Sequence, residues 1–195
     1  MAKLTFLLLG ALIMLGLVWL RTAYLTFRAQ KPDDYAQTTP VFDIRDHLNG
    51  TIDCDGVIYG PTGRVTSRFV GVFHAEWDGN TGTMTEHFEY DNGNTQDREW
   101  TLVVDDQGRI KATAPDVIGL GSGWQSGAAV QLQYKIKLPE TAGGHVLDTI
   151  DWMYLGPNGV ITNRSQLSKF GIKVAELVAT MRPRAAESDQ QLAAE

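Results

Sequence analysis

Hydrophobic and polar positions divide the chain into an apolar beginning, a short polar stretch and a long region of short alternating runs. The apolar beginning contains residues 4–20 (LTFLLLGALIMLGLVWL), which carry no charge and reach the lower length limit for a helix that spans a bilayer. Residues 22–27 add apolar length behind Arg21, and Trp19, Tyr24 and Phe27 are aromatics of the kind found at membrane interfaces. This pattern predicts an N-terminal transmembrane helix within residues 1–28.

The same beginning also occurs in secretory signal peptides, which end in a small-residue cleavage site. The nearest candidates, residues 21–23 (RTA) and 27–29 (FRA), do not fit such a site, so a retained anchor is favoured over a cleaved signal. No Cys follows the apolar run to accept a lipid. Lys3 precedes the helix and three basic residues within 21–31 follow it, which slightly favours a cytoplasmic body by the positive-inside rule.

Beyond a polar linker over residues 29–41, apolar or alternating runs are separated by turn clusters rich in Gly, Asn, Asp and Pro, which is the pattern of β-hairpins. The high Gly content, 20 residues in 195, also indicates many turns. We expect a polar tail over 183–195 without fixed structure. The strands expected from this pattern are 50–59, 64–77, 83–90, 95–104, 109–114, 129–138, 145–155, 159–168 and 171–181.

The alternation is clearest over residues 130–138, where apolar side chains on one face alternate with Gln and Lys on the other. Residues 171–181 also fit a helical spacing, but a strand is favoured there. Eight or nine consecutive strands without room for crossover helices predict an all-β domain over 42–182, an up-and-down antiparallel meander that closes into a barrel. A twisted sandwich is the alternative. At this strand number a barrel interior is either filled by side chains or holds one small ligand.

Charge and cysteine content narrow the function. Four of the 17 basic residues and none of the 23 acidic ones lie in residues 1–31, so residues 32–195 carry 13 basic and 23 acidic residues, a net charge of -10. A body this acidic is a poor candidate for binding nucleic acid or anionic lipid. The single cysteine, Cys54, excludes a disulfide framework and a Cys-based metal site, and it fits either compartment.

Two groups of residues invite a chemical interpretation that we judge weaker than a structural one. His74, Glu76, His87 and Glu89 face one another across an expected hairpin and suggest a metal or acid–base site, but a solvated outer face is favoured. Residues 119–127 (GLGSGWQSG) lack the Lys-Ser/Thr ending of a phosphate-binding loop and are interpreted as a flexible loop at the rim of the barrel.

The densest groupings of aromatic and charged residues indicate a ligand site inside the barrel, with aromatic walls and one or two polar groups. The candidate ligand-binding residues are Arg98, Trp100, Tyr134, Asp151, Trp152 and Tyr154. Arg98 is the expected partner of a fatty carboxylate, because a guanidinium forms two parallel hydrogen bonds and stays charged. The alternative is an ordinary core in which Arg98 pairs with an acid such as Asp151.

Several short motifs follow one another along the expected barrel: Phe69 with residues 77–83 (WDGNTGT), 89–91 (EYD), 98–102 (REWTL), 112–119 (ATAPDVIG), 151–154 (DWMY), 163–164 (NR) and 169–171 (KFG). In these motifs and their order the chain resembles a bacterial family of domains of unknown function, number 3833, whose members are often described as lipoproteins. The resemblance covers about residues 42–182. It implies a lipocalin-like barrel in the bacterial envelope, and it places the body in the periplasm against the weak charge count. It carries no catalytic residue.

These observations predict a protein tethered to the bacterial inner membrane, with a periplasmic barrel that binds or shields an apolar small molecule such as a fatty acyl lipid. Neither a cofactor nor a metal is expected. The alternatives are an enzyme or enzyme accessory in lipid modification, with Asp151 or His87 as acid–base group, and a structural partner of envelope enzymes with a filled barrel. Two titratable groups with shifted pKa in one pocket would favour catalysis.

Overall fold

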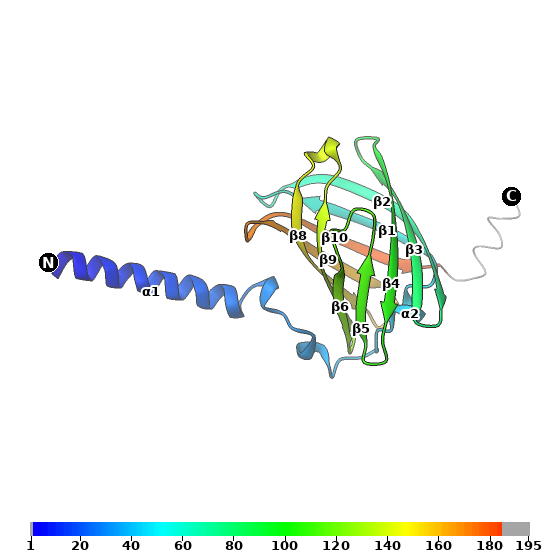
Figure 1. Ribbon diagram of the computed structural model, residues 1–195, viewed down its shortest axis with the longest axis horizontal. Coiled ribbons are helices and arrows are strands. Elements are labelled where there is room, and N and C mark those ends of the chain that lie inside the picture. The colour runs from blue at the N-terminus through cyan, green and yellow to red at the C-terminus, as the bar shows by residue number, and fades with distance from the viewer. Residues whose placement is uncertain (1, 185–195) are drawn as a thin grey trace, which may run out of the picture.

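The computed structural model describes residues 2–184 and shows one apolar helix followed by a closed antiparallel barrel (Figure 1). The helix α1 (Ala2–Tyr24) has a mean hydropathy of 2.2, and none of its residues is buried against the rest of the chain. Its 23 residues correspond to a length of about 34 Å, enough to cross the hydrocarbon layer of a bilayer. By length and composition α1 therefore qualifies as a membrane anchor or a signal sequence.

Ten strands form the barrel, and each pairs with the next along the chain. They are β1 (Gly50–Tyr59), β2 (Val65–Asp78), β3 (Thr81–Tyr90), β4 (Thr95–Val104), β5 (Arg109–Thr113), β6 (Gly121–Ser126), β7 (Ala129–Lys137), β8 (Val146–Leu155), β9 (Ile161–Lys169) and β10 (Ile172–Pro183). The pairing of β1 with β10 closes the sheet and removes its edges. The predicted up-and-down barrel is confirmed, and the sandwich alternative is excluded.

The strand count differs from the expectation because β6 was interpreted as a flexible rim loop. Its inward positions Gly121 and Gly123 give no apolar alternation, so the segment has no strand signal in the sequence. A Cβ on Gly123 would lie 2.2 Å from the Gln131 carbonyl oxygen, so only glycine allows β6 and β7 to approach this closely. The strand interpretation of residues 171–181 is confirmed by β10, which is extended over its whole length.

The short helix α2 (Ile44–His47) closes one end of the barrel, which we call the capped end. Ile44 and Leu48 are almost fully buried in the barrel core. The helix and its flanking residues, 42–48, form a capping segment, which is bound to the turn between β6 and β7: Phe42 N donates to Gly127 O at 2.7 Å. Trp77 Nε1 donates to Leu48 O at 2.7 Å and ties the segment to β2. The turns β2–β3, β4–β5, β6–β7 and β8–β9 lie at this end, and the other turns lie at the opposite end.

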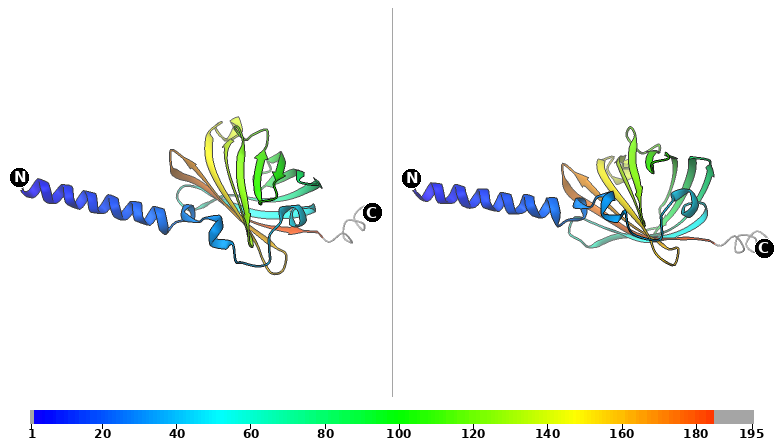
Figure 2. Two further views of the ribbon diagram at one scale, coloured as in Figure 1. Left: turned by 60° about the horizontal axis from the view of Figure 1, so that its bottom comes forward. Right: turned by 90° about the horizontal axis from the view of Figure 1, so that it is seen from below.

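The polar stretch expected as a linker belongs to a connecting segment, residues 27–41, that is folded against the outer wall of the barrel. It contains two single-turn helices, η1 (Phe27–Ala29) and η2 (Pro32–Tyr35), and a third, η3 (Glu140–Ala142), lies between β7 and β8. Tyr35 packs on Trp152 of β8 with ring centroids 5.2 Å apart. Figure 2 shows this segment passing over the strands between α1 and α2. Of the expected tail, Pro183 ends β10, and residues 185–195 lie outside the described residues.

Candidate functional site

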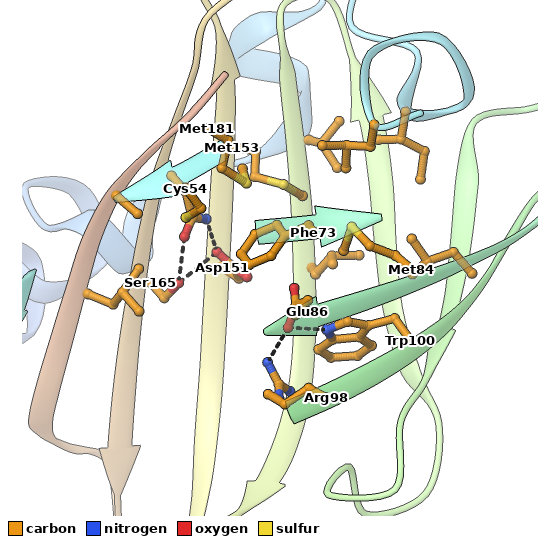
Figure 3. A pocket seen from close by; sticks show the side chains of 18 of the residues that line it. Cys54, Phe73, Met84, Glu86, Arg98, Trp100, Asp151, Met153, Ser165 and Met181 are labelled. Carbon is orange, nitrogen blue, oxygen red and sulfur yellow. Dashed lines mark hydrogen bonds and ion pairs between the residues drawn. The ribbon is translucent and has the colours of Figure 1, made fainter. Parts of the chain in front are cut away.

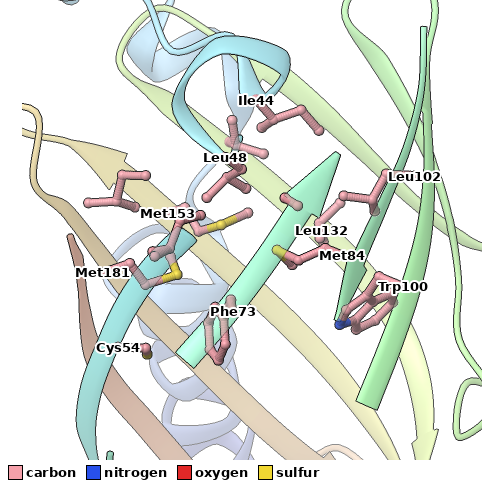
Figure 4. Packing of buried hydrophobic residues seen from close by; sticks show 14 of the residues in the cluster. Ile44, Leu48, Cys54, Phe73, Met84, Trp100, Leu102, Leu132, Met153 and Met181 are labelled. Atoms are coloured by element: carbon pink, nitrogen blue, oxygen red, sulfur yellow. The ribbon is translucent and has the colours of Figure 1, made fainter. Parts of the chain in front are cut away.

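An apolar cavity of about 100 Å³ lies inside the barrel (Figure 3), and Figure 4 shows the packing of buried hydrophobic residues around it. Its walls carry three aromatic phenylalanine rings and three methionines, and Ile44 and Leu48 of the capping segment form one boundary. The methionines are Met84, Met153 and Met181, which are the methionines of the chain beyond residue 14. Methionine is flexible and fills irregular spaces, so this part of the wall can repack around an occupant.

A charged cluster lies at one side of the cavity. Arg98 of β4 contacts Glu86 of β3 (Nη1 to Oε2, 3.2 Å) and Asp116 of the β5–β6 connection (Nε to Oδ2, 2.7 Å). Trp100 Nε1 donates to the same Glu86 oxygen at 3.3 Å, and the Arg98 guanidinium lies 4.8 Å from the centre of the Trp100 ring. Figure 3 shows Glu86 between Arg98 and Trp100. The cluster fixes the Arg98 head between two carboxylates.

A second polar group lies across the cavity on β8 and β9. Asp151 accepts hydrogen bonds from Ser165 Oγ at 2.7 Å and from the Asn163 side-chain amide. Burial raises the pKa of Asp151, although these hydrogen bonds and Arg98 act in the opposite direction. Burial likewise raises the pKa of Glu86 from 4.5 to about 7, against the stabilising effect of Arg98. The cavity therefore contains two carboxyl groups that hold protons more tightly than in water.

The charged cluster also faces an outer groove of about 740 Å³, so Glu86 and Arg98 line both spaces. The groove exists because β4 pairs with β5 only from Thr101 to Val104. In the described part of the chain, no strand pairs with residues 95–100 on that side. Residues 116–118 extend the wall beside β7 instead, through the Val117–Ile136 bridge. The Arg98–Asp116 ion pair spans the resulting break in the wall.

Four of the six predicted ligand residues meet in the cavity: Arg98, Trp100, Tyr134 and Asp151 line it. Trp100 and Tyr134 contact edge to face with centroids 5.1 Å apart. Arg98 is paired, as the alternative interpretation expected, but its partners are Glu86 and Asp116, and Asp151 binds Ser165 and Asn163 instead. A fatty carboxylate would therefore meet an arginine that already has two partners.

The prediction that Trp152 and Tyr154 face the same interior is wrong. Successive side chains of a strand point to opposite faces, so Asp151 and Met153 point inward whereas Trp152 and Tyr154 point outward. Trp152 is buried under the segment that precedes the barrel, against Phe27 and Tyr35. Tyr154 stacks on Trp152 and donates from its hydroxyl to Gln30 Oε1 at 2.7 Å. These two aromatics hold the connecting segment to the wall and do not line the cavity.

Glu86 and Asp116 were not among the predicted site residues. Glu86 has a signal: it lies between Met84 and Phe88 in the inward register of β3, where a charged residue is unexpected without a partner. Asp116 has no signal, because it reaches Arg98 from an irregular connection. His74, Glu76, His87 and Glu89 lie on exposed positions of the outer face, as interpreted. His87 Nδ1 lies 2.6 Å from Asp97 and its Nε2 lies 3.8 Å from Glu89.

Comparison with solved structures supports the fold. The S-type phycobiliprotein lyase CPES from Guillardia theta superposes with a TM-score of 0.56 at 10% identity, over 80% of this chain and 99% of that chain. Rv2717c from M. tuberculosis superposes with a TM-score of 0.52 at 15% identity, over 76% of this chain and 100% of that chain. At these identities the likeness extends to the lipocalin-like barrel fold.

Among curated proteins, none matches the sequence. A family model described as a protein of unknown function, DUF3833, matches residues 22–183. The match includes the whole barrel together with the capping segment and the connecting segment on the outer wall. It confirms the resemblance drawn from the motifs, and it shows that the connecting segment is part of the family's pattern. The chain therefore belongs to the DUF3833 family.

Proposed function

We propose that the chain is a membrane-tethered envelope barrel that binds a fatty acyl lipid. The observation that carries the proposal is an apolar cavity that shares Glu86 and Arg98 with the outer groove as lining residues. An acyl chain would lie among the methionines and phenylalanines, and the polar end of the lipid would lie at the charged cluster. Burying an acyl chain releases roughly 0.8 kcal/mol per CH₂, which supplies the driving force.

The size of the cavity determines how the chain would be accommodated. A 150 Å³ apolar cavity in an engineered protein holds a benzene molecule, so the 100 Å³ here suits a smaller group without rearrangement. A longer acyl segment requires Met84, Met153 or Met181 to change rotamer, which methionine does at low cost. The remainder of the lipid would occupy the outer groove. Binding would therefore rearrange the methionine side of the wall.

The charge of the cluster selects the polar end of the lipid. Glu86 and Asp116 pair with the single guanidinium of Arg98, and Asp151 lies across the cavity, so a fatty carboxylate would add negative charge to a site with an excess of acids. An uncharged hydroxyl or ester group avoids this repulsion and donates to or accepts from the cluster. We therefore propose neutral acyl lipids in place of the free fatty acids that the sequence alone suggested.

Native mass spectrometry of the detergent-purified chain, followed by lipid extraction, tests the proposal. Long-chain alcohols and monoacylglycerols should bind more tightly than fatty acids of the same length at pH 8. Ala179→Leu narrows the cavity and should weaken binding, whereas Thr180→Leu changes the neighbouring position on the outer face and should not. Leu132→Ala enlarges the cavity and should shift the preference to longer chains. A filled, structural barrel would bind none of these lipids in any variant.

Catalysis on the bound lipid is a second candidate, and the raised pKa of both Glu86 and Asp151 favours it. A barrel of the same fold is named as a lyase. Incubating the chain with its co-purified lipid and following the lipid mass would test this candidate. A changed lipid with the native chain, and an unchanged lipid with Glu86→Gln and with Asp151→Asn, would support it. An unchanged lipid throughout leaves binding as the function.

The proposed location is the inner membrane with the barrel in the periplasm. Its support is α1, which is apolar along its length and exposed, together with the envelope setting that the family resemblance implies. Protease added to spheroplasts tests the orientation. A periplasmic barrel should be degraded before the cells are lysed, and survival until lysis would place it in the cytoplasm.

A further inference from the structure

The β9–β10 turn is unusual for an acidic domain. It consists of Phe170 and Gly171, and Phe170 is 91% exposed while Ile172, the first residue of β10, is 70% exposed. Lys169 and Lys173 flank these residues, and residues 168–175 contain no carboxylate. An apolar tip with cationic neighbours is the composition of segments that enter the interfacial region of a bilayer.

The backbone of the turn makes this phenylalanine harder to explain as a chance surface residue. Both loop residues have positive φ, 53° at Phe170 and 79° at Gly171, which is a type I′ turn. The first position of such a turn favours Asn, Asp or Gly, and a bulky side chain there costs conformational energy. Among the described residues, Phe170 is the one non-glycine residue with positive φ. Phe170 is thus an exposed aromatic at a turn position whose backbone favours Asn, Asp or Gly.

The turn is tied to the end of the apolar helix. Arg28 Nη1 donates to Gly171 O at 3.1 Å. Arg28 follows the last residue of α1, Tyr24, by four residues, which span at most about 14 Å of backbone. In Figures 1 and 2 the β9–β10 and β1–β2 hairpins are the parts of the barrel that reach toward α1. The turn is therefore held close to where α1 would leave the bilayer.

Other exposed apolar residues lie at the same end of the barrel. Val65, Ile118, Leu120 and Val146 are between 42% and 60% exposed, and they belong to the turns opposite the capped end. The charge of the hairpin differs from that of the body: residues 164–176 contain three basic residues and one acid, the buried Glu176, which contacts both Arg164 and Lys173. Lys169, beside the tip, contacts His145 at 3.0 Å. The overall acidity that argues against anionic lipid therefore does not describe this hairpin.

From these observations we infer that the β9–β10 tip inserts Phe170 and Ile172 into the lipid interface beside α1. The occupant of the apolar tip is the bilayer surface itself. This second contact holds the barrel so that the end opposite the capped end faces the membrane. Without it, the barrel would be free to reorient about the anchor helix. The inference rests on the membrane tether of the proposed function and is independent of the ligand, so a failed lipid titration leaves it standing.

The test uses the full chain in nanodiscs of phosphatidylcholine with a fraction of phosphatidylglycerol. Phe170→Cys is labelled with an environment-sensitive nitrobenzoxadiazole dye; Cys54 is buried with its thiol pKa raised to about 12, so it stays unlabelled. The matched control is Val103→Cys, an exposed β4 position near the capped end. We expect a blue-shifted label at position 170 and at least twofold stronger quenching by lipid-borne nitroxide than at position 103.

Equal quenching at the two positions would overturn the inference. A blue shift without quenching by the lipid nitroxide would also overturn it, because the tip would then contact protein, another copy of the chain included. A chain absent from the discs would remove the tether and the inference together. A further variant separates insertion from folding: Phe170→Asn suits the turn and should raise the thermal midpoint, yet it should reduce quenching of a label placed by Ile172→Cys.

Discussion

Replacing Glu86 by Gln should change the pH dependence of stability in a direction fixed by the geometry of the charged cluster. Burial raises the pKa of Glu86 from 4.5 to about 7. The folded protein therefore holds this proton more tightly than the unfolded chain. Glu86 stabilises the fold fully below pH 4.5, and this contribution is lost as the pH rises to about 7. The pKa difference corresponds to about 3 kcal/mol.

Glutamine keeps the oxygen that accepts from Arg98 and Trp100 but does not titrate. The free energy of unfolding of the wild type, minus that of Glu86→Gln, should fall by about 3 kcal/mol between pH 4.5 and pH 8. Urea titrations of the full chain in detergent micelles, followed by tryptophan fluorescence at several pH values, measure this difference. Curves for the two proteins that stay parallel within about 1 kcal/mol would refute the assignment of a buried, proton-retaining Glu86.

Glu176→Gln is the matched control. Burial raises the pKa of Glu176, but hydrogen bonds from Lys173 and Arg164 outweigh it and lower the pKa below 4.5. The contribution of Glu176 is therefore present above that pH and is lost only as the pH falls further. The difference between the wild type and Glu176→Gln should stay constant from pH 5.5 to pH 8. A slope there would show that the method responds to surface charge in general.

Three further outcomes follow from the fold. Gly123→Ala should destabilise the chain by about 2 kcal/mol or more, measured by urea unfolding, because its Cβ would meet the Gln131 carbonyl; an unchanged midpoint would show that β6 and β7 can separate. The intact mass of the membrane-fraction protein should include residues 2–20, and a mature chain beginning near residues 24–31 would contradict the retained anchor. A fragment beginning at residue 26 should be soluble with a β-type circular dichroism spectrum. A fragment beginning at residue 40 should have a lower thermal midpoint because it uncovers Trp152; equal thermal midpoints would show that the connecting segment adds no stability.

The sequence predicted the barrel because its evidence is local. Alternation over residues 130–138 indicates a single strand, and each turn cluster indicates a single hairpin. In an antiparallel meander every strand pairs with its neighbour along the chain, so these local signals are enough to predict the sheet. The strand β6 was missed for the same reason. Its inward positions are glycines because β7 lies too close for a side chain, and that distance leaves no local pattern in the sequence. Residues 29–41 were expected to be a free linker because their polar composition hides Tyr35, and Phe27 was assigned to the membrane anchor; the two residues together cover Trp152.

The candidate site was partly predictable. Arg98, Trp100, Tyr134 and Asp151 were found because charged and aromatic residues in alternating strands are conspicuous. Their partners were not found, since Asp116 reaches Arg98 across a break in the wall that depends on how far β4 and β5 pair. Whether Trp152 points inward or outward could be decided only from the register of β8. It was grouped with Asp151 because the two are adjacent in sequence, although adjacent residues of a strand point to opposite faces.

The pairing of β1 with β10 has a consequence for biosynthesis. Nine of the ten strand pairings join neighbours along the chain, so their hairpins can form as the chain emerges. The remaining one joins Ile52 to Pro183, so the sheet stays open, with two unpaired edges, until the last strand has been made. A chain that stops before residue 172 would be an aggregation-prone open sheet and not a smaller barrel. The barrel can therefore close only after the whole of β10 has been synthesised.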